Sequence, residues 1–311
     1  MTRERTYEGR ALPKPGEEVV DQGLGFDLTT LMGRRGLLLA LGAGAVAFGV
    51  AACGRDTVSE AVAPADSPTA GTTVTEIPDE TAGPYPADGS NGPDVLDQSG
   101  IVRSDIRSSF GGATGTAEGV PMDLELTILD LANDGAPFAN TAVYVWHCDR
   151  EGRYSLYSEG VQDQNYLRGV QIADAQGVVR YTSIYPACYA GRWPHIHFEV
   201  YPDQASITDS ANAIATSQIA LPQDVSETVY AQPGYEASVG NLAQVTLAGD
   251  NVFGDNDGAG QLATVTGDVT NGYKVSLTVG VDTTTTPSGG GGQAPGGPGG
   301  PGGTPPSPPG S

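Results

Sequence analysis

Hydrophobic and polar residues alternate along several short stretches of the chain. Between residues 122 and 128 every second residue is apolar and the residues between are polar, which is typical of a strand with one buried face. The residues at 275–279 alternate in the same way, and further strand-like runs lie at 141–148, 170–173, 178–184 and 262–269. Asn271-Gly272 separates the runs at 262–269 and 275–279, and Asn-Gly between such runs is a strong signal for a β-hairpin. The pattern therefore predicts a domain built from short strands.

Helical periodicity is weak throughout the chain. Apolar residues recur at helical spacing only around 206–217 and 235–247, and both stretches are short. The strand pattern occupies residues 76–282, which is long enough for one hydrophobic core. We therefore predict an all-β domain, a β-sandwich with antiparallel or mixed sheets, long loops and a few short helices.

The segments that flank this domain have a different composition. The chain contains 45 Gly and 23 Pro in 311 residues, and many of them lie in the uncharged segment 283–311. Such a segment buries too little apolar surface to offset the entropy lost on ordering, so we predict a disordered tail. Residues 54–75 are rich in Ala, Ser, Thr, Pro and acidic side chains, which is typical of a flexible tether.

The N-terminal region carries an export pattern. Arg34-Arg35 precedes sixteen uncharged, mostly apolar residues at 37–52, and Cys53 follows them. A run of this length is shorter than the roughly 20 residues that span a bilayer, and it matches the apolar core of a secretion signal. The twin arginines indicate the Tat pathway, and Val50-Ala51-Ala52-Cys53 resembles the lipobox of a bacterial lipoprotein.

Residues 1–53 are therefore predicted to be a twin-arginine lipoprotein signal. The Tat machinery is then a partner, and the mature protein lies outside the cytoplasmic membrane, at the cell surface, attached only through a lipid on Cys53. Two points stay open, because translation could start at Met32 and the signal could be cleaved without lipidation. The alternative for Cys53 is a buried thiol after an apolar helix.

The net charge of −22 belongs to the part of the chain after this signal. Residues 1–53 contain six basic and six acidic side chains, which leaves 9 basic and 31 acidic side chains after Cys53. A surface this acidic repels phosphate backbones and anionic lipid headgroups. The charge therefore argues against nucleic acid as a partner and against membrane attachment through a basic patch.

The chain has only three histidines, and they fall in two segments. His147 lies in one segment, and His195 and His197 lie in the other. On a strand, residues i and i+2 project from the same face about 6.6 Å apart, so His195 and His197 can bind one metal ion together. Further ligands would be His147, cysteines or oxygen donors. The alternative is that the two histidines bind no metal and are ordinary surface or core residues.

The segment 182–197 resembles the signature of the intradiol ring-cleavage dioxygenases. That signature has a tyrosine upstream of an arginine, which is followed three residues later by His-x-His. Other segments fit the secreted, Tat-exported branch of the family: 80–85, 143–154 and 168–171 with Asp174. The similarity covers 76–282, extends to the catalytic domains of protocatechuate and catechol dioxygenases, and implies their β-sandwich fold. The N-terminal helical segment through which catechol dioxygenases dimerise is missing, so the oligomeric state stays open.

The resemblance implies a non-haem Fe(III) site. The motifs match four ligands, which are Tyr154, Tyr189, His195 and His197. Phenolates are hard anionic donors and stabilise ferric over ferrous iron. The choice of tyrosines rests on the motifs, because four others lie nearby in the sequence: Tyr157, Tyr166, Tyr181 and Tyr185.

By the same resemblance, the activity is the intradiol cleavage of a catechol-type aromatic diol. Both atoms of O2 enter the product, a muconate-type diacid. Tyr189 would leave the metal and help to accept a proton, and Arg192 would stabilise negative charge that develops on the ring. The alternative for Arg192 is a salt bridge with one of the many acidic residues. The identity of the diol stays open.

Three other residues in or near the motifs have expected roles that are less specific. His147 matches a strand motif of the secreted branch, and we expect it to support the ligands or to pack in the core. Cys148 and Cys188 lie near the two tyrosine segments, which permits a disulfide in an exported protein.

Two other classes of protein fit parts of the pattern. A Zn(II) or Fe(II) enzyme could use His195, His197 and Glu199, although we expect Glu199 to be exposed to solvent. A catalytically silent β-sandwich at the cell surface would be a binding module. A ferric-tyrosinate protein is red to burgundy, whereas the other two kinds are nearly colourless.

Overall fold

The structure is a computed structural model, and it describes residues 6–7, 10–11 and 74–287. The chain divides into two units, Met1–Ser67 and Pro68–Ser311. In the first unit, the described residues form strands β1 (Thr6–Tyr7) and β2 (Arg10–Ala11), which pair antiparallel. The predicted signal at 1–53 and tether at 54–75 lie almost entirely outside the described residues, as does most of the predicted tail at 283–311.

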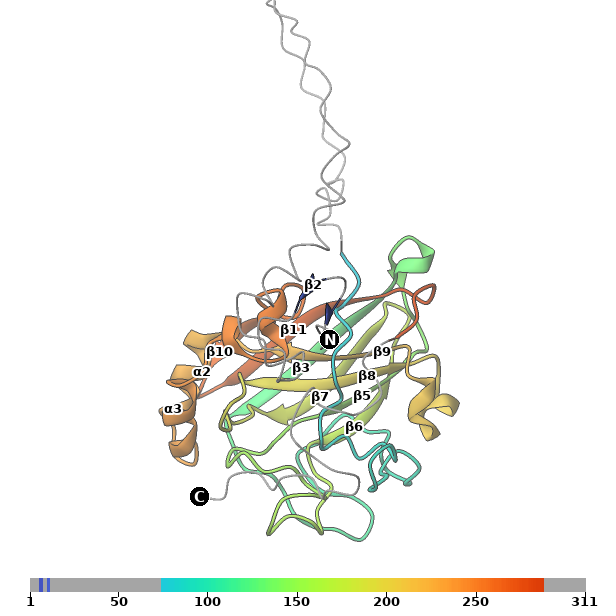
Figure 1. Cartoon of the computed structure of the whole chain (residues 1–311). Coiled ribbons are helices and arrows are strands. Elements are labelled where there is room, and N and C mark those ends of the chain that lie inside the picture. Colours follow the sequence, from blue (N-terminus) through green and yellow to red (C-terminus); the bar gives the residue numbers. More distant parts are fainter. Residues whose placement is uncertain (1–5, 8–9, 12–73, 288–311) are drawn as a thin grey trace, which may run out of the picture. The chain divides into compact units, whose positions relative to one another are not determined.

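Two sheets and two short α-helices make up the described part of the second unit (Figure 1). Its strands are β3 (Pro121–Asp130), β4 (Ala136–Pro137), β5 (Ala142–Trp146), β6 (Arg168–Ile172), β7 (Val178–Ile184), β8 (His195–Tyr201), β9 (Ala215–Ala220), β10 (Thr264–Asp268) and β11 (Gly272–Val281). The α-helices are α2 (Gln223–Tyr230) and α3 (Glu236–Leu242), and 3-10 turns lie at Leu131–Asn133, Gln204–Thr208, Ser210–Asn212, Leu247–Gly249 and Phe253–Asp255. The prediction of an all-β sandwich with few short helices is confirmed.

The first sheet has five strands and mixed directions. β3 lies at its centre, with β11 parallel to it on one side and β7 antiparallel to it on the other. β10 and β11 form the hairpin that Asn271-Gly272 predicts, and β4 pairs with the end of β3. Every second residue of β3 is buried, as its alternating sequence predicts.

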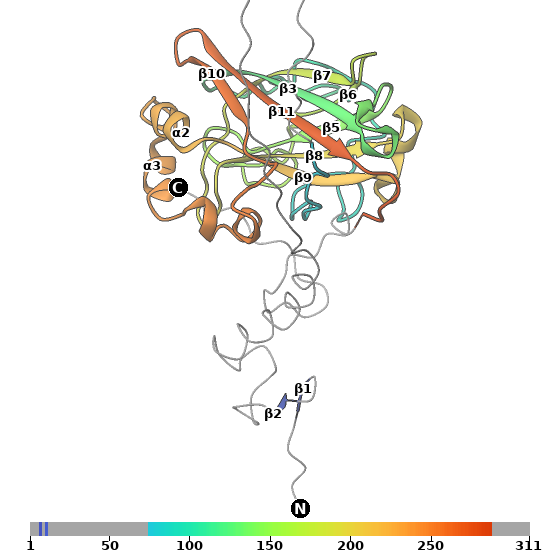
Figure 2. The ribbon, with the colours of Figure 1, turned by 90° about the horizontal axis from the view of Figure 1, so that it is seen from above.

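The second sheet has the order β6-β5-β8-β9 and is antiparallel throughout. Figure 2 shows β3, β7, β10 and β11 in a layer next to β5, β8 and β9. One face of the second sheet packs on the first sheet, and its core residues include Val143, Val145, Ile196, Phe198 and Ile219. Every residue of β5, β8 and β9 is buried, because loops cover the opposite face as well. That covered face carries the histidines.

Helical structure differs from the weak sequence signals. The prediction of a helix around 206–217 is wrong, because 3-10 turns and the start of β9 occupy that stretch. α3 lies within the second expected stretch, 235–247. α2 has too few buried positions to show helical periodicity, since only Ser226, Val229 and Tyr230 are buried. Among the described residues, no helix has the length and apolar character needed to cross a membrane.

Candidate metal centre

β8 carries the His-x-His motif on the face of the second sheet that the loops cover. The side chains of His195 and His197 are buried there, at 2% and 3% exposure. The indole of Trp146, on the neighbouring strand β5, stacks on the His197 ring with centroids 4.9 Å apart and planes 7° apart. The alternation of the strand therefore places both imidazoles on one face, as the sequence predicts.

Hydrogen bonding fixes which nitrogen of His195 is free to act as a ligand. Its Nδ1 faces the carbonyl oxygen of Trp193, which can only accept a hydrogen bond, so Nδ1 carries the proton. The lone pair is then on Nε2, which lies 3.1 Å from His197 Nε2. His197 Nδ1 is buried and has no hydrogen-bond partner within the described part of the chain. The two Nε2 atoms thus converge on one point beside the sheet.

Two tyrosines from separate loops reach this pair of histidines. The Tyr189 hydroxyl lies 3.2 Å from His195 Nε2, and the Tyr154 ring meets the Tyr189 ring edge to face at 5.9 Å between centroids. The Tyr154 and His197 ring centroids are 6.1 Å apart. The Tyr154 hydroxyl is buried, and no described residue forms a hydrogen bond with it. The structure brings together the four residues that the motifs match.

The competing tyrosines and His147 have other partners. Their hydroxyls form hydrogen bonds as follows: Tyr157 with Asn91, Tyr166 with Asp149, Tyr181 with the Val143 carbonyl and Tyr185 with Ser226. His147 uses both ring nitrogens, since Nδ1 lies 2.8 Å from the Cys148 carbonyl and Nε2 lies 2.7 Å from the Ser183 hydroxyl. Its burial agrees with the expected role in the core or behind the ligands.

Three of the four polar atoms have separations that suit a metal site. Two ligand atoms, each about 2.1 Å from one ion and at right angles, lie about 3 Å apart, which matches the separations at His195 Nε2. Burial holds the pKa of both histidines well below its usual value, so both imidazoles are neutral, as ligation requires. Burial raises the pKa of Tyr189 to about 12 and that of Tyr154 well above its usual value. A cation would displace these phenol protons, and two phenolates with two imidazoles suit Fe(III).

Arg192 lies beside these residues in a fixed orientation. Its Nε donates to Asp250 Oδ2 at 2.9 Å, and its Nη2 donates to Gln218 Oε1 at 2.7 Å. Burial lowers the pKa of Arg192, but Tyr189 and Asp250 outweigh this effect, so the pKa rises above its usual value. The salt bridge that the sequence offers as an alternative does form, with Asp250. The sequence did not indicate Asp250 or Gln218, which lie far from Arg192 along the chain.

Two further loops approach the same region. Phe253 packs near His195, with ring centroids 6.5 Å apart, and Thr81 lies close because its carbonyl accepts a hydrogen bond from Gln218. Burial and the charge of Asp255 raise the pKa of Glu80 to about 7, against the influence of Gln261 and Arg192. Glu80 is therefore a half-buried carboxyl that exchanges its proton near neutral pH.

Glu199 does not behave as the sequence predicts. The expected exposure is wrong, because Glu199 is 1% exposed and accepts a hydrogen bond from the Tyr201 hydroxyl at 2.7 Å. Burial raises its pKa to about 8, helped by the charge of Asp88. Within the described ranges, no three His, Cys, Asp or Glu side chains are grouped so that they could hold a metal ion. This finding disfavours a site made from His195, His197 and Glu199.

Cys148 and Cys188 are free thiols in the structure. Both are buried, and the Cys148 thiol faces the carbonyl of Ala187 while the Cys188 thiol faces the carbonyl of Arg192. The disulfide that the sequence permits is therefore absent from the described domain. Each thiol instead packs beside one of the loops that carry the candidate ligands.

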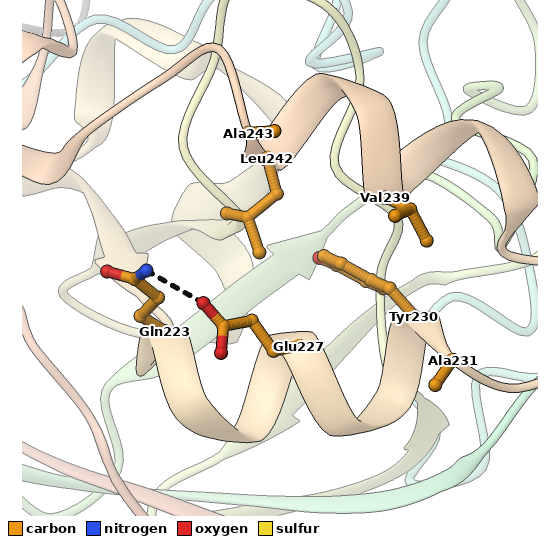
Figure 3. A pocket seen from close by; sticks show the side chains of 7 residues that line it. All are labelled: Gln223, Glu227, Tyr230, Ala231, Val239, Leu242 and Ala243. Atoms are coloured by element: carbon orange, nitrogen blue, oxygen red, sulfur yellow. Dashed lines mark hydrogen bonds between the residues drawn. The ribbon is translucent and has the colours of Figure 1, made fainter.

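A hollow of about 240 Å³ between α2 and α3 has a different character (Figure 3). Its lining is mostly apolar, with Tyr230, Val239 and Leu242 among its residues, and the Glu227 carboxylate already accepts a hydrogen bond from Gln223. The hollow contains neither the histidines nor the tyrosines of the candidate metal centre.

Gly83 offers a test of how closely the loop packs on His197. It has φ +72, and a Cβ added there would lie 3.3 Å from His197 Cε1. We expect Gly83→Ala to lower the free energy of unfolding by about 1–2 kcal/mol and also to weaken metal binding by displacing the imidazole. Gly135→Ala is the matched control, because Gly135 has φ +74 and open space around its Cβ position. Urea unfolding should show that the two variants are destabilised equally. Metal titration should show weaker binding only in Gly83→Ala. Equal metal affinity in both variants would contradict the expected contact with His197.

Comparison with known proteins finds similarity to dioxygenases in the segment that carries the candidate residues. A family model described as "Dioxygenase" matches residues 91–200, and that range contains Tyr154, Tyr189, Arg192, His195 and His197. Chlorocatechol 1,2-dioxygenase from Rhodococcus opacus is 34% identical over 55 residues, which are 18% of this chain and 21% of that protein. The matched part therefore spans about a fifth of this curated relative.

Two solved structures of dioxygenases are similar to this chain. An intradiol ring-cleavage dioxygenase from Tetranychus urticae superposes with a TM-score of 0.54 at 20% identity, and the match covers 68% of this chain and 96% of that chain. The dioxygenase domain of a carbohydrate-binding fusion protein from Streptomyces sp. SirexAA-E gives a TM-score of 0.43 at 20% identity over 67% of this chain and 99% of that chain. The first of these similarities shows that the domain has the fold of an intradiol ring-cleavage dioxygenase.

Proposed function

We propose that this chain is a non-haem Fe(III)-dependent intradiol dioxygenase that cleaves a catechol-type aromatic diol with O2. The observation that carries the proposal is the approach of two imidazole nitrogens from β8 and the Tyr189 hydroxyl to one point, with the Tyr154 ring packed against Tyr189 and His197. The match of residues 91–200 to a dioxygenase family model supports the same reaction class.

The metal would be held by Tyr154, Tyr189, His195 and His197. Ferric iron, when bound, would supply Lewis acidity to the two diol oxygens. The chain keeps the imidazoles in place through Trp146 and the Trp193 carbonyl, so these two donors need no rearrangement before they bind.

The two tyrosines would have different roles because their exposure differs. Tyr154 is 1% exposed, whereas Tyr189 is half-buried, so an incoming diol reaches Tyr189 first. Burial raises the pKa of Tyr189 to about 12, and its phenolate therefore accepts a proton readily from a diol hydroxyl. Tyr189 would thus hold the substrate proton, while Tyr154 stays in place.

Arg192 would supply a fixed positive charge at the reacting ring. Its guanidinium is held by Asp250 and Gln218, so it costs no reorganisation when negative charge develops. The carbon–carbon bond between the two hydroxyl-bearing carbons breaks, both atoms of O2 are incorporated, and these carbons become the carboxyl groups of a muconate-type diacid.

The proposed location is the cell surface, outside the cytoplasmic membrane. Arg34-Arg35, the apolar residues 37–52 and Cys53 support Tat export and a lipid anchor. The proposed reaction would then act on aromatic compounds outside the cytoplasmic membrane.

Iron loading and oxygen consumption test the proposed reaction. Protein loaded with Fe(III) should show a visible tyrosinate-to-iron charge-transfer band and consume about one O2 per diol cleaved, with a muconate-type product. A panel of catechol, hydroxyquinol and protocatechuate covers neutral and anionic diols. A colourless iron-replete protein, or a coloured one inert towards every diol, would contradict the proposal.

A further inference from the structure

Two turns of the domain share one backbone design. The first is 149–153, Asp-Arg-Glu-Gly-Arg, and the second is 174–178, Asp-Ala-Gln-Gly-Val. In each, Oδ1 of the aspartate accepts hydrogen bonds from the amides two and four residues later, at 2.9–3.1 Å. In each, the fourth residue is a glycine with positive φ, +84 at Gly152 and +74 at Gly177. The aspartate therefore has a local structural role in both turns.

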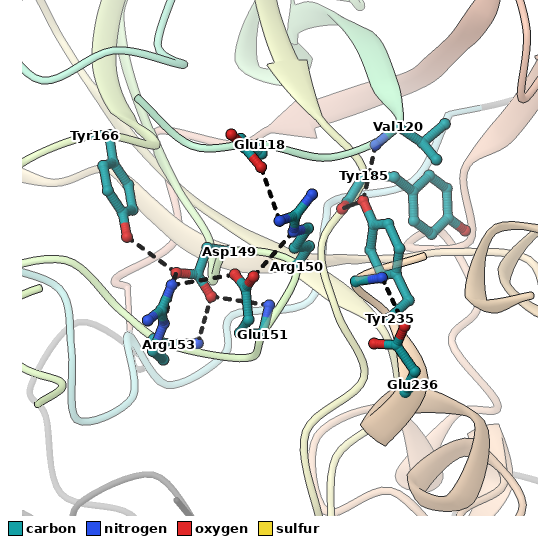
Figure 4. Close-up of polar contacts among 11 residues, drawn as sticks. Glu118, Val120, Asp149, Arg150, Glu151, Arg153, Tyr166, Tyr185, Tyr235 and Glu236 are labelled. Atoms are coloured by element: carbon teal, nitrogen blue, oxygen red, sulfur yellow. Dashed lines mark hydrogen bonds and ion pairs between the residues drawn. The ribbon is translucent and has the colours of Figure 1, made fainter. Parts of the chain in front are cut away.

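The two aspartates differ in what else they bind. The Asp174 side chain is 41% exposed, and among the described residues its Oδ2 pairs with Arg180 alone, at 3.2 Å. Asp149 is 1% exposed, and its Oδ2 accepts hydrogen bonds from Arg153 Nε and from the Tyr166 hydroxyl, both at 2.9 Å (Figure 4). Asp149 is thus a buried carboxylate whose two oxygens are both engaged, and its local turn does not require the additional donors.

The Asp149 turn contacts both tyrosines of the candidate metal centre. Tyr154 directly follows the turn in the sequence. The Asp149 carbonyl accepts a hydrogen bond from the Ala187 amide at 3.3 Å, two residues before Tyr189. A Cβ placed on Gly152 would lie 3.3 Å from Tyr189 Cβ. One short turn therefore lies against both loops that bring phenol oxygens to the histidines.

On its solvent side, the Asp149 turn carries a network of ion pairs. Arg153 Nη2 lies 2.9 Å from Asp149 Oδ2 and 3.1 Å from Glu151, and Arg150 pairs with Glu118 at 2.8 Å and with Glu151 at 2.9 Å. Figure 4 shows these side chains gathered around Asp149. The exposed pairs contribute little stability by themselves, but the buried charge-assisted bonds to Asp149 are stronger.

We propose that Asp149 is a positioning residue, which sets the relative placement of Tyr154 and Tyr189 at the metal. This inference rests on the proposed function, since it assigns to Asp149 the geometry of the phenolate ligands. Two oxygens are needed, because Oδ1 receives only amide protons and Oδ2 receives the Arg153 proton. An asparagine at position 149 has the same shape, but its NH2 group can only donate hydrogen bonds. In either orientation of the amide, that group would face N–H donors of the protein, which cannot accept from it.

The test compares Asp149→Asn with Asp174→Asn in the full chain loaded with Fe(III). The readouts are the position and intensity of the charge-transfer band, the iron dissociation constant and the thermal midpoint. We expect Asp149→Asn to shift or weaken the band and to lower iron affinity about 10–100-fold, as removal of partners behind metal ligands does. Asp174→Asn, which changes the same kind of turn away from the tyrosines, should keep the wild-type band and affinity.

Tyr166→Phe tests the same carboxylate without changing the turn. It removes only the hydroxyl that donates to Asp149 Oδ2, so it should fold even if Asp149→Asn does not. A band shift in Tyr166→Phe, smaller than that of Asp149→Asn, is the expected result. If wild type shows the band and neither variant at positions 149 and 166 changes it, the inference is overturned while the proposed function stands. If wild type loaded with iron shows no band, the proposed function falls, and the inference falls with it.

Discussion

Tyr154→Phe is expected to abolish ring cleavage while leaving the iron-free protein at least as stable as wild type. The Tyr154 hydroxyl is buried without a hydrogen-bond partner among the described residues, and such a group costs about 1–3 kcal/mol. Removing it relieves this cost in the iron-free protein but deletes a proposed metal ligand. Loss of partners behind metal ligands already costs 10–100-fold, so loss of the ligand should lower turnover by at least about 100-fold.

The opposite signs of these two effects make the prediction specific. Thermal unfolding of the iron-free protein, iron titration and oxygen uptake measure the three quantities involved. Tyr157→Phe is the matched control, because Tyr157 is also near this site but donates its hydroxyl proton to Asn91. That control should lose some stability and keep its colour. If Tyr154→Phe destabilised the iron-free protein and kept the visible band, Tyr154 would be a structural residue and not a ligand.

The alternating pattern predicted most directly the strands that have one buried face. β3 and β7 alternate between buried and more exposed positions, and their boundaries follow the hydrophobic pattern. β9 gave no such pattern, since all six of its residues are buried, including Ser217 and Gln218. Burial on both faces removes the alternation from which a strand is predicted, so β9, a polar strand next to the candidate metal centre, could not be predicted.

The candidate site was predictable where it is local in sequence. His195 and His197 lie on one face because strands alternate, and that conclusion needs no tertiary information. The tyrosines could be chosen only by resemblance, because their convergence depends on how two loops fold over the sheet. Hydrogen bonding in the structure is compatible with this choice: the four competing hydroxyls have other partners, whereas that of Tyr154 has none among the described residues.

Long-range polar contacts were beyond sequence analysis for a different reason. Asp250 lies 58 positions after Arg192, and nothing in the sequence distinguishes it from the other acidic residues of this chain. Glu199 was expected in solvent because carboxylates are seldom buried, but the loops that cover the second sheet enclose it. Glu199 lies on the strand face that carries the histidines, and Asp250 binds Arg192 from a loop, so the sequence underestimated how far charged groups are buried around the candidate centre.

The burial of these charges makes Arg192 sensitive to a conservative substitution. Its guanidinium donates to Asp250 through Nε and to Gln218 through Nη2, and a lysine amine cannot reproduce this fork. We expect Arg192→Lys to lower kcat about 100–1000-fold, the loss seen when one fixed donor to a developing negative charge is removed. Stopped-flow measurement of ring cleavage, together with the visible spectrum, separates this effect from loss of iron.

Asp250 should remain in place when Arg192 is changed, which is why the effect falls on the reaction. The backbone amides of Trp193, Val252 and Phe253 also donate to its carboxylate, at 2.7, 2.8 and 3.2 Å. Arg180→Lys is the matched control, since Arg180 pairs with Glu125 on the exposed side of the first sheet and should tolerate the change. The iron band should persist in Arg192→Lys because the arginine is not a proposed ligand. A kcat within tenfold of wild type, or a loss of activity that parallels loss of the band, would refute a direct electrostatic role for Arg192 and leave it as a structural partner of Asp250.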